Sequence, residues 1–268
     1  MENDFKLIVH QFDDNITIYP ISDVHLGSLE HNSDEWDKFI DKIKKEPNSY
    51  IVLAGDLMNN STRSSVSNIF DEVLRPREQK ERLIKYLTPL KEKILCAVSG
   101  NHERRSMKDA DNDPMYDVMC KLNLEHLYRQ NIAFMKIRIG QRPKNRSKRS
   151  GECSTYTFAV THGAGGGIFT GASVNRNERF GYTIDNLDCL IVGHTHKGTV
   201  TKPAKIVIDP RTDTVSIKPF TVVTSQSWMS YGGYAVQKML LPSSNAYADC
   251  GQKILLTKQR NKAISVIW

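Results

Sequence analysis

Seven side chains suited to binding metal ions lie in five short polar clusters within the first 196 residues of the chain. Each cluster follows an apolar run. In chain order, the candidate ligands are Asp23, His25, Asp56, Asn101, His162, His194 and His196. Carboxylate, amide and imidazole groups offer oxygen and nitrogen but no thiolate, and such a set suits divalent ions such as manganese, iron or zinc. The residue types therefore predict a divalent metal site.

Each cluster alone has a structural explanation. The order and spacing of all five together indicate a functional site. A lone Asp-x-His or Gly-Asp is common in turns, and Gly-Asn-His-Glu at 100–103 could simply open a helix. Asp23 and His25 are separated by one residue, so on a straight strand both side chains would point the same way; His194 and His196 have the same spacing. Five of the chain's eight histidines fall in these clusters, which favours one shared site.

The elements that must position these clusters are short strands. The five apolar runs that precede them are Ile16–Ile21, Tyr50–Ala54, Ile94–Val98, Thr157–Val160 and Leu190–Val192. The last four are almost continuously apolar, as in strands buried on both faces. Ligands of open α/β sheets bind beyond the carboxyl ends of the strands, so we expect the five clusters to meet at one place.

Helical patterns and further strands complete the expected fold. Apolar residues recur at helical spacing in three segments, led by Trp36, Leu83 and Met115. After residue 197 the pattern becomes strand-like, and the expected strands are Ile206–Ile208, Val215–Ile217, Thr221–Thr224, Lys253–Thr257 and Ala263–Ile267. These patterns predict an α/β protein with a β-rich C-terminal part, folded as a single domain over residues 1–268.

Composition and net charge indicate the class of substrate and the cellular compartment. The 268-residue chain has a formal net charge of +7, which favours anionic substrates. No apolar run reaches the length of a membrane span, and the first residues lack the pattern of a signal peptide. The five cysteines are scattered and form no C-x-x-C pair, so we expect no disulfide framework. These features predict a cytoplasmic protein without a membrane partner.

Taken in order, the clusters resemble the signature of the calcineurin-like metallophosphoesterase family. Asp-x-His, Gly-Asp, Gly-Asn-His-Glu, a later His and Gly-His-x-His follow one another in this order, and the resemblance covers roughly residues 16–197. The resemblance implies a four-layer α/β/β/α sandwich with two divalent metal ions, for which manganese is our first choice and iron, zinc, nickel or magnesium are alternatives. It assigns one ion to Asp23, His25 and His196, the other to Asn101, His162 and His194, and makes Asp56 the bridge.

The same resemblance implies an activity. His102 would face the phosphate as a general acid or a transition-state stabiliser, and a water activated by the two metals would hydrolyse a phosphate ester. The Gly-Asp motif continues as Leu-Met-Asn-Asn, where Ser/Thr protein phosphatases have Val-Asp-Arg-Gly. The motifs at 22–27 and 55–57 look more like those of nucleases and small phosphodiesterases. We therefore expect a compact, cap-free bacterial or phage-type phosphodiesterase acting on nucleotides or nucleic acid, including single strands.

Two alternatives stay open. One is a phosphomonoesterase or protein phosphatase, and the other is a non-catalytic scaffold that binds proteins. Arg104 is a candidate for substrate binding because it follows the His102 motif. The basic stretch 136–149 is either a solvated loop or a segment that binds the phosphate backbone of a nucleic acid. Trp228 is either a base-stacking surface or a packing residue, and we favour packing.

Overall fold

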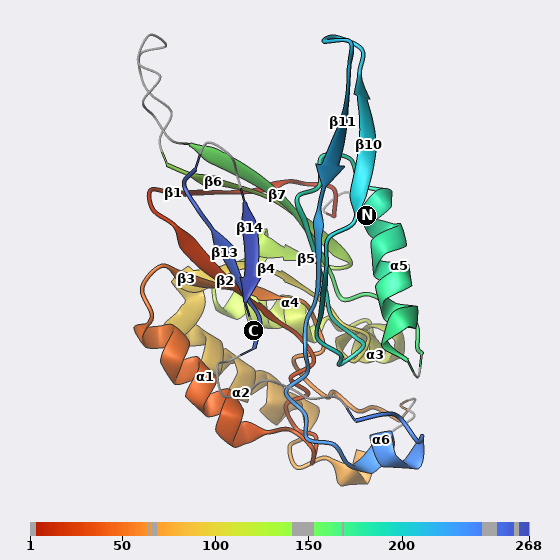
Figure 1. Cartoon of the computed structure of the whole chain (residues 1–268). Coiled ribbons are helices and arrows are strands. Elements are labelled where there is room, and N and C mark those ends of the chain that lie inside the picture. The colour runs from red at the N-terminus through yellow and green to blue at the C-terminus, as the bar shows by residue number, and fades with distance from the viewer. Residues whose placement is uncertain are drawn as a thin grey trace.

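Two mixed sheets packed face to face form the body of the protein (Figure 1). The structure is a computed structural model that describes residues 4–63, 65, 69–140, 153–167, 169–242, 251–259 and 263–267. Helices α1 and α2 cover the outer side of one sheet, and α5 covers the other (Figure 1). The predicted four-layer α/β/β/α arrangement is confirmed.

The first sheet has the strand order β14-β13-β2-β3-β4-β5. Its strands are β2 (Ile16–Ile21), β3 (Ser49–Leu53), β4 (Ile94–Val98), β5 (Tyr128–Arg129), β13 (Lys253–Leu256) and β14 (Ile264–Ile267). Strands β2 to β5 run parallel, whereas β13 pairs antiparallel with both β2 and β14. Three of the strands that precede polar clusters therefore lie side by side in this sheet.

The second sheet has the order β1-β6-β7-β8-β12-β9. Its strands are β1 (Ile8–Phe12), β6 (Ile132–Ile139), β7 (Ser154–Thr161), β8 (Cys189–Val192), β9 (Thr199–Thr201) and β12 (Thr221–Thr224). Strands β7, β8 and β12 are parallel to one another, which brings the remaining two cluster-bearing strands together. The two sheets thus share the five clusters between them.

The helices bury the apolar stripes that the sequence predicts. Their bounds are α1 (Ser33–Lys45), α2 (Pro76–Leu87), α3 (Glu103–Ala110), α4 (Pro114–Lys121), α5 (Thr170–Tyr182) and α6 (Gly233–Gln237), with 3₁₀ turns at Ile69–Asp71, Thr88–Lys93 and Glu125–Leu127. Asn32 caps α1 by accepting a hydrogen bond from the backbone N–H of Glu35, 3.3 Å away. The predicted helical segment led by Leu83 ends as an α-helix at Leu87, and a 3₁₀ turn containing Pro89 follows.

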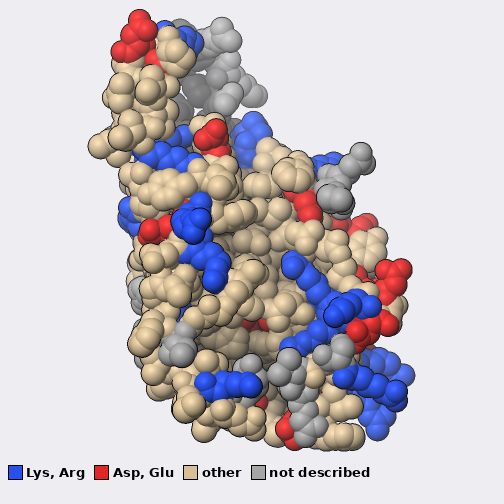
Figure 2. Space-filling model, turned by 90° about the vertical axis from the view of Figure 1, so that its right-hand side faces the viewer, with Lys and Arg blue, Asp and Glu red and all other residues tan. Residues whose placement is uncertain are grey.

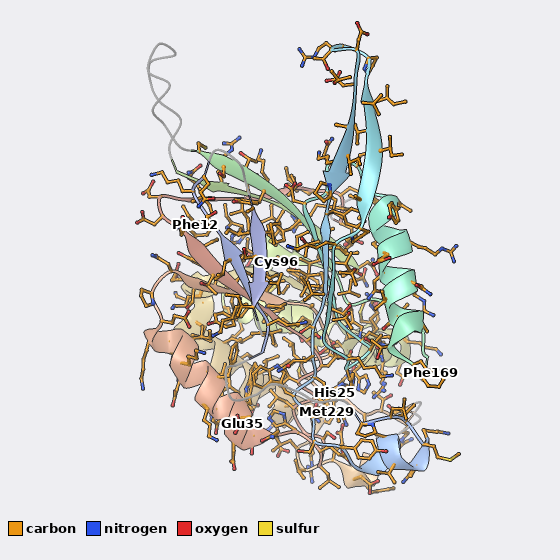
Figure 3. The ribbon with its side chains drawn as sticks, in the orientation of Figure 1. Phe12, His25, Glu35, Cys96, Phe169 and Met229 are labelled. Atoms are coloured by element: carbon orange, nitrogen blue, oxygen red, sulfur yellow. The ribbon has the colours of Figure 1, made fainter. Side chains whose placement is uncertain are left out.

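The core lies between the sheets, where Cys96 on β4 is fully buried (Figure 3). Trp228 also belongs to the core, since its ring packs 5.1 Å from Trp36 and 4.8 Å from Phe39. Packing is therefore its role in the fold. In the described part of the chain, no helix is long and apolar enough to cross a membrane, and four cysteines are unpaired thiols.

One further strand pair stands apart from both sheets. Strands β10 (Ala204–Asp209) and β11 (Thr214–Pro219) form an antiparallel hairpin, which extends from the top of the molecule in Figure 1. The sequence predicts both strands, although each is longer than the predicted run. The basic stretch 136–149 contributes Lys136 and Arg138 to β6, and its residues from 141 onward lie outside the described residues.

Candidate metal centre

The five polar clusters meet at one end of the two facing sheets. Asp23 and His25 follow β2, Asp56 follows β3 and Asn101 follows β4, all in the first sheet. His162 follows β7, and the pair His194 and His196 follows β8, both in the second sheet. Figure 3 labels His25 at this lower end, whereas Phe12 lies towards the opposite end. The expectation that the clusters converge is confirmed.

Unusual backbone conformations aim these side chains at one another. Five of the seven candidate ligands have positive φ: Asp23 at 54°, His25 at 49°, Asp56 at 52°, His194 at 75° and His196 at 58°. Each such non-glycine residue costs on the order of 1–3 kcal/mol, and such strain is concentrated at functional sites. The chain therefore leaves each strand by a sharp, locally unfavourable turn that the surrounding structure maintains.

Two glycines allow the first-sheet loops to approach closely. A Cβ atom on Gly55, whose φ is +86°, would lie 2.5 Å from the backbone nitrogen of Gly100. A Cβ atom on Gly100 would lie 2.0 Å from Oδ1 of Asp56. Neither position has room for a larger residue, so glycine is required at both.

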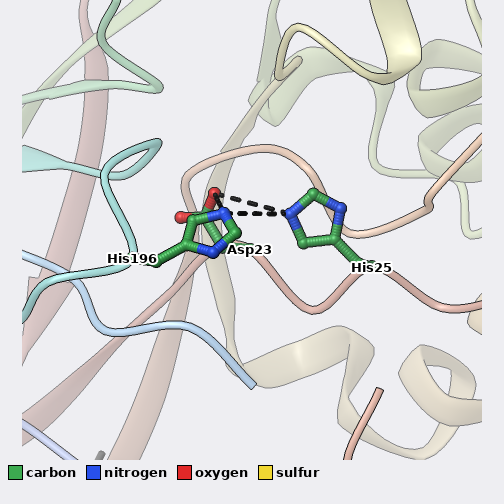
Figure 4. A group of neighbouring side chains, drawn as sticks. All are labelled: Asp23, His25 and His196. Carbon is green, nitrogen blue, oxygen red and sulfur yellow. Dashed lines mark hydrogen bonds and ion pairs between the residues drawn. The ribbon is translucent and has the colours of Figure 1, made fainter. Parts of the chain in front are cut away.

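Asp23, His25 and His196 form the first group of candidate ligands (Figure 4). Oδ2 of Asp23 accepts hydrogen bonds from Oγ of Ser22 at 2.5 Å and from the backbone N–H of His194 at 2.9 Å. Its other oxygen, Oδ1, lies 3.2 Å from Nε2 of His196 and 3.8 Å from Nε2 of His25. Among the described residues this buried oxygen has no hydrogen-bond partner, so one lone-pair-bearing atom is left for a cation.

Asp56, Asn101, His162 and His194 form the second group. Oδ1 of Asn101 lies 2.9 Å from Nε2 of His162 and 2.8 Å from Nδ1 of His194. Oδ2 of Asp56 lies 3.1 Å from the same Nε2 of His162. Atoms that carry lone pairs thus converge from four loops, two from each sheet.

Asp56 lies between the two groups. It belongs to the set with His162 and His194 and also to a set with His25 and His102 in which ligand atoms lie within 4.8 Å of one another. Burial raises the pKa of the Asp56 carboxyl, but His162 and His102 have the opposite effect and hold that pKa below its ordinary value. Burial lowers the pKa of His162, and Asp56 more than offsets this and raises it to about 9. Positive charge is therefore favourable beside this carboxylate.

Hydrogen bonds from the outer ring nitrogens orient two of the histidines. Nδ1 of His162 donates to the carbonyl oxygen of Ala54 at 2.8 Å, and Nδ1 of His25 donates to Oδ1 of Asn59 at 3.3 Å. In each ring Nε2 is then the nitrogen that faces the site, where a bound cation would take the place of its proton. Metal-binding histidines are usually held in this way.

These residues fit a pair of divalent ions. The unpartnered Oδ1 of Asp23, the imidazole nitrogens that face the site and the neutral oxygen of Asn101 are ligands for hard to borderline metals. The set carries two carboxylates in a buried setting, where uncompensated charge is costly. Cations would supply that compensation.

The family comparison agrees with this geometry. A model of the calcineurin-like phosphoesterase family matches residues 16–198. The chain belongs to the calcineurin-like phosphoesterase family. It is therefore a metal-dependent phosphoesterase, a hydrolase of phosphate esters.

The phosphoesterase is similar to several solved structures at low sequence identity. It is similar to a conserved uncharacterized protein, a predicted phosphoesterase, from Streptococcus pneumoniae TIGR4, with 14% identity, 94% of this chain and 97% of that chain covered, and a TM-score of 0.32. It is also similar to a mutant of a cold-active protein tyrosine phosphatase, with 10% identity, 99% and 84% covered, and a TM-score of 0.36. These distant likenesses carry no argument about activity. No curated protein matches the chain significantly.

His102 borders the phosphoesterase centre in a neutral form. Its Nδ1 donates to the carbonyl oxygen of Asn59 at 2.8 Å, and its Nε2 accepts from Nη2 of Arg105 at 3.0 Å. Burial lowers the pKa of His102 to about 3, against the opposing effect of Asp56. Arg105 also donates from Nη1 to Asn59, whereas Arg104 donates from Nη2 to the carbonyl oxygens of Ser99 and Gln130. Of the two arginines, Arg105 is the one that contacts His102.

Glu103 is a supporting residue to which the sequence interpretation gives no role. Its fully buried carboxylate accepts hydrogen bonds from the backbone N–H groups of Asp56 at 2.9 Å, Met58 at 3.0 Å and Gly100 at 2.8 Å. One side chain thus ties the Asp56 loop to the Asn101 loop. The signal that could have revealed it is a glutamate directly after Asn101-His102 at the expected start of a helix.

Proposed function

We propose that this phosphoesterase hydrolyses phosphodiester bonds in nucleotides or nucleic acid. The observation that carries the proposal is the convergence of seven oxygen- and nitrogen-bearing side chains from the ends of five strands. In this proposal, Asp23, His25 and His196 hold one ion, Asn101, His162 and His194 hold the other, and Asp56 bridges them. Manganese is our first choice for both positions, because the ligands mix oxygen with imidazole nitrogen.

The ions, when bound, supply Lewis-acid polarisation of the phosphate and activation of a water nucleophile. The protein's own contribution is to orient and to balance charge. The Ala54 carbonyl keeps the His162 ring fixed, and Asn101 adds an oxygen without adding negative charge. The site therefore retains a net attraction for an anionic substrate.

His102 and Arg105 are proposed to face the phosphate together. A general acid must carry a proton on the atom that faces the leaving group. Nε2 of His102 accepts a hydrogen bond from Arg105 and carries no such proton. Transition-state stabilisation by the pair, with Arg105 supplying the charge, therefore accounts better for the geometry than proton donation by His102. The proposal for Arg104 as a substrate contact remains, and the two arginines can be tested against each other.

Several observations support a nucleotide or nucleic-acid diester as the substrate. The net charge of +7 favours anions, and lysine and arginine side chains surround a hollow on the face shown in Figure 2. The segment after Asp56 is Leu57-Met58-Asn59-Asn60 in place of Val-Asp-Arg-Gly. Its Asn59 carbonyl holds both His102 and Arg105, so an arginine reaches this part of the site from α3.

We also propose that residues 1–268 form one domain and that the protein works in the cytoplasm. Strands β9 and β12 complete the sheet of β7 and β8, and β13 pairs with β2. The C-terminal part thus extends both sheets. Buried, unpaired Cys96 and Cys189 suit a reducing compartment.

The test of substrate class compares manganese-loaded protein on matched chromogenic substrates, bis-p-nitrophenyl phosphate and p-nitrophenyl phosphate. We expect kcat/KM to be at least about tenfold higher for the diester, a difference of roughly 1.4 kcal/mol in transition-state stabilisation. Cyclic nucleotides and single-stranded DNA and RNA then narrow the class. Faster turnover of the monoester would support a phosphomonoesterase instead. Metal binding without any turnover would support a scaffold.

A further inference from the structure

The β10–β11 hairpin is an isolated two-stranded ribbon. Its strands pair with each other from Ala204 opposite Pro219 to Asp209 opposite Thr214. Within the described part of the chain, neither strand pairs with a third. Two-stranded ribbons without a packed face are marginally stable in water, so we expect contacts made by its faces to stabilise this ribbon.

One face of this ribbon is entirely apolar. Directly opposed residues of an antiparallel pair share a face, and the hairpin's apolar face consists of Ala204, Ile206, Ile208, Val215, Ile217 and Pro219. Ile206 is 78% exposed, Ile208 71%, Val215 69% and Ile217 76%. A protein that works alone seldom exposes a row of branched aliphatic side chains of this kind.

The opposite face carries the polar residues and is the one that contacts the body. Lys205 lies opposite Lys218 on this face. Nζ of Lys205 donates to the carbonyl oxygen of Ile184 at 2.6 Å, and Nζ of Lys218 donates to Oδ1 of Asn186 at 2.9 Å. An antiparallel sheet usually packs its apolar face on the core and exposes its polar face to water. In this hairpin the polar face contacts the body and the apolar face is exposed.

We propose that the hairpin's apolar face is a dimer interface that packs on the same face of a second copy of this chain. The face has no charged residue, so its best complement is another uncharged, flat β surface, as in packed sheets. A two-fold axis through its middle would place identical patches together. The exposed fractions of Ile206, Ile208, Val215 and Ile217 amount to a patch on the order of 500 Å², and two copies would bury about 1,000 Å², which reaches the lower bound for a specific interface.

The interface is remote from the metal centre. The hairpin extends from the upper end of the molecule, and His25 lies at the lower end (Figures 1 and 3). Dimerisation can therefore be tested without disturbing hydrolysis.

The test measures the mass of the full chain in solution by sedimentation velocity and by light scattering, over a wide concentration range. We expect a species of twice the 30.5 kDa chain mass. In the double variant Ile206→Thr/Ile217→Thr, threonine keeps the β-branched shape. We expect its dimer dissociation constant to rise at least about 100-fold, because four substituted side chains meet in one interface. The matched control is Val207→Thr on the opposite face, which should dimerise like the wild type.

Circular dichroism and turnover of a small phosphate ester should be unchanged in the double variant, which separates a lost interface from a lost fold. A chain that is monomeric at every concentration would overturn the proposal, as would a dimer that survives the double substitution. Monomers that bind lipid vesicles or another protein through Ile206 would assign the face to a different occupant and overturn it as well.

Discussion

The metal centre and the β10–β11 hairpin depart from the usual distribution of polar and apolar residues in opposite directions. At the centre, the carboxylates of Asp23 and Asp56 are at most 1% exposed. On the hairpin, Ile206 and Ile217 are more than three-quarters exposed. Buried charge and exposed aliphatic surface are the two informative exceptions to the rule that apolar residues lie inside. Each indicates a place where the chain is proposed to bind a further component, which is metal ions at the centre and a second copy of the chain at the hairpin.

The two regions differ in how they are built. The centre draws side chains from five strands of two sheets, so its geometry depends on the whole fold. The hairpin is formed by neighbouring residues and touches the body mainly through its base. A change at the centre should therefore alter chemistry strongly, whereas a change on the hairpin should alter association.

The largest effect is expected from Asp56→Asn. Asp56 is proposed to serve both ions, so the loss of its charge weakens two sites at once. We expect kcat/KM to fall by about 10³-fold or more, equivalent to roughly 4 kcal/mol. The matched control is His194→Gln, a ligand of one ion only, which should lose less. Steady-state kinetics and metal analysis check this. An Asp56→Asn protein with two ions and normal turnover would refute the bridging role.

A smaller effect, on stability, should come from Ile254→Ala. Ile254 on β13 is fully buried and lies opposite Ile18 of β2. We expect the free energy of unfolding to fall by about 2–5 kcal/mol in one cooperative denaturant transition. The same change at exposed Ile206 should cost within about 0.5 kcal/mol in dilute, monomeric protein. Two separate transitions in the wild type would contradict the single-domain proposal.

The smallest catalytic effect is expected from Arg105→Ala. Removal of a charged hydrogen-bond donor costs about 1.5–3 kcal/mol, so kcat/KM should fall by roughly 10- to 100-fold. Arg104→Ala is the natural control, because the Arg104 guanidinium binds the carbonyl oxygens of Ser99 and Gln130. Equal losses for both variants, or a larger loss for Arg104→Ala, would reassign the phosphate contact to Arg104.

The convergence of the candidate ligands was easier to predict than the elements around them. Asp23, His25 and the other five stand in compact motifs directly after apolar runs, so type and spacing were enough to predict that they meet. Strands β1 and β6 were not predicted. Residues of β6 alternate between buried and half-buried, but its Lys136 and Arg138 belong to the basic stretch that was interpreted as a loop or a phosphate contact. The parts that depend on side-chain direction could not be predicted. In the sequence, Arg104 and Arg105 both follow the His102 motif and cannot be told apart. In the structure, the first turn of α3 directs the Arg105 side chain towards His102.

The hairpin shows a similar limit. Its two strands are readable as aliphatic runs, Ile206–Ile208 and Val215–Ile217, and both are confirmed. Which face meets the body is set by distant partners such as Ile184 and Asn186, and no local pattern encodes that choice. An aliphatic strand is ordinarily predicted to lie in the core. The exposure of the hairpin's isoleucines could therefore be recognised only from the structure.

Hydrolysis is proposed to depend on two divalent ions held by the seven residues at the strand ends. The most direct measurement is metal analysis of chelator-treated protein reloaded with manganese, paired with turnover of a phosphodiester in the same samples. We predict no turnover after chelation, and its recovery as two ions per chain are restored. Full activity in the metal-free sample, or recovery with no ion bound at these residues, would contradict the account.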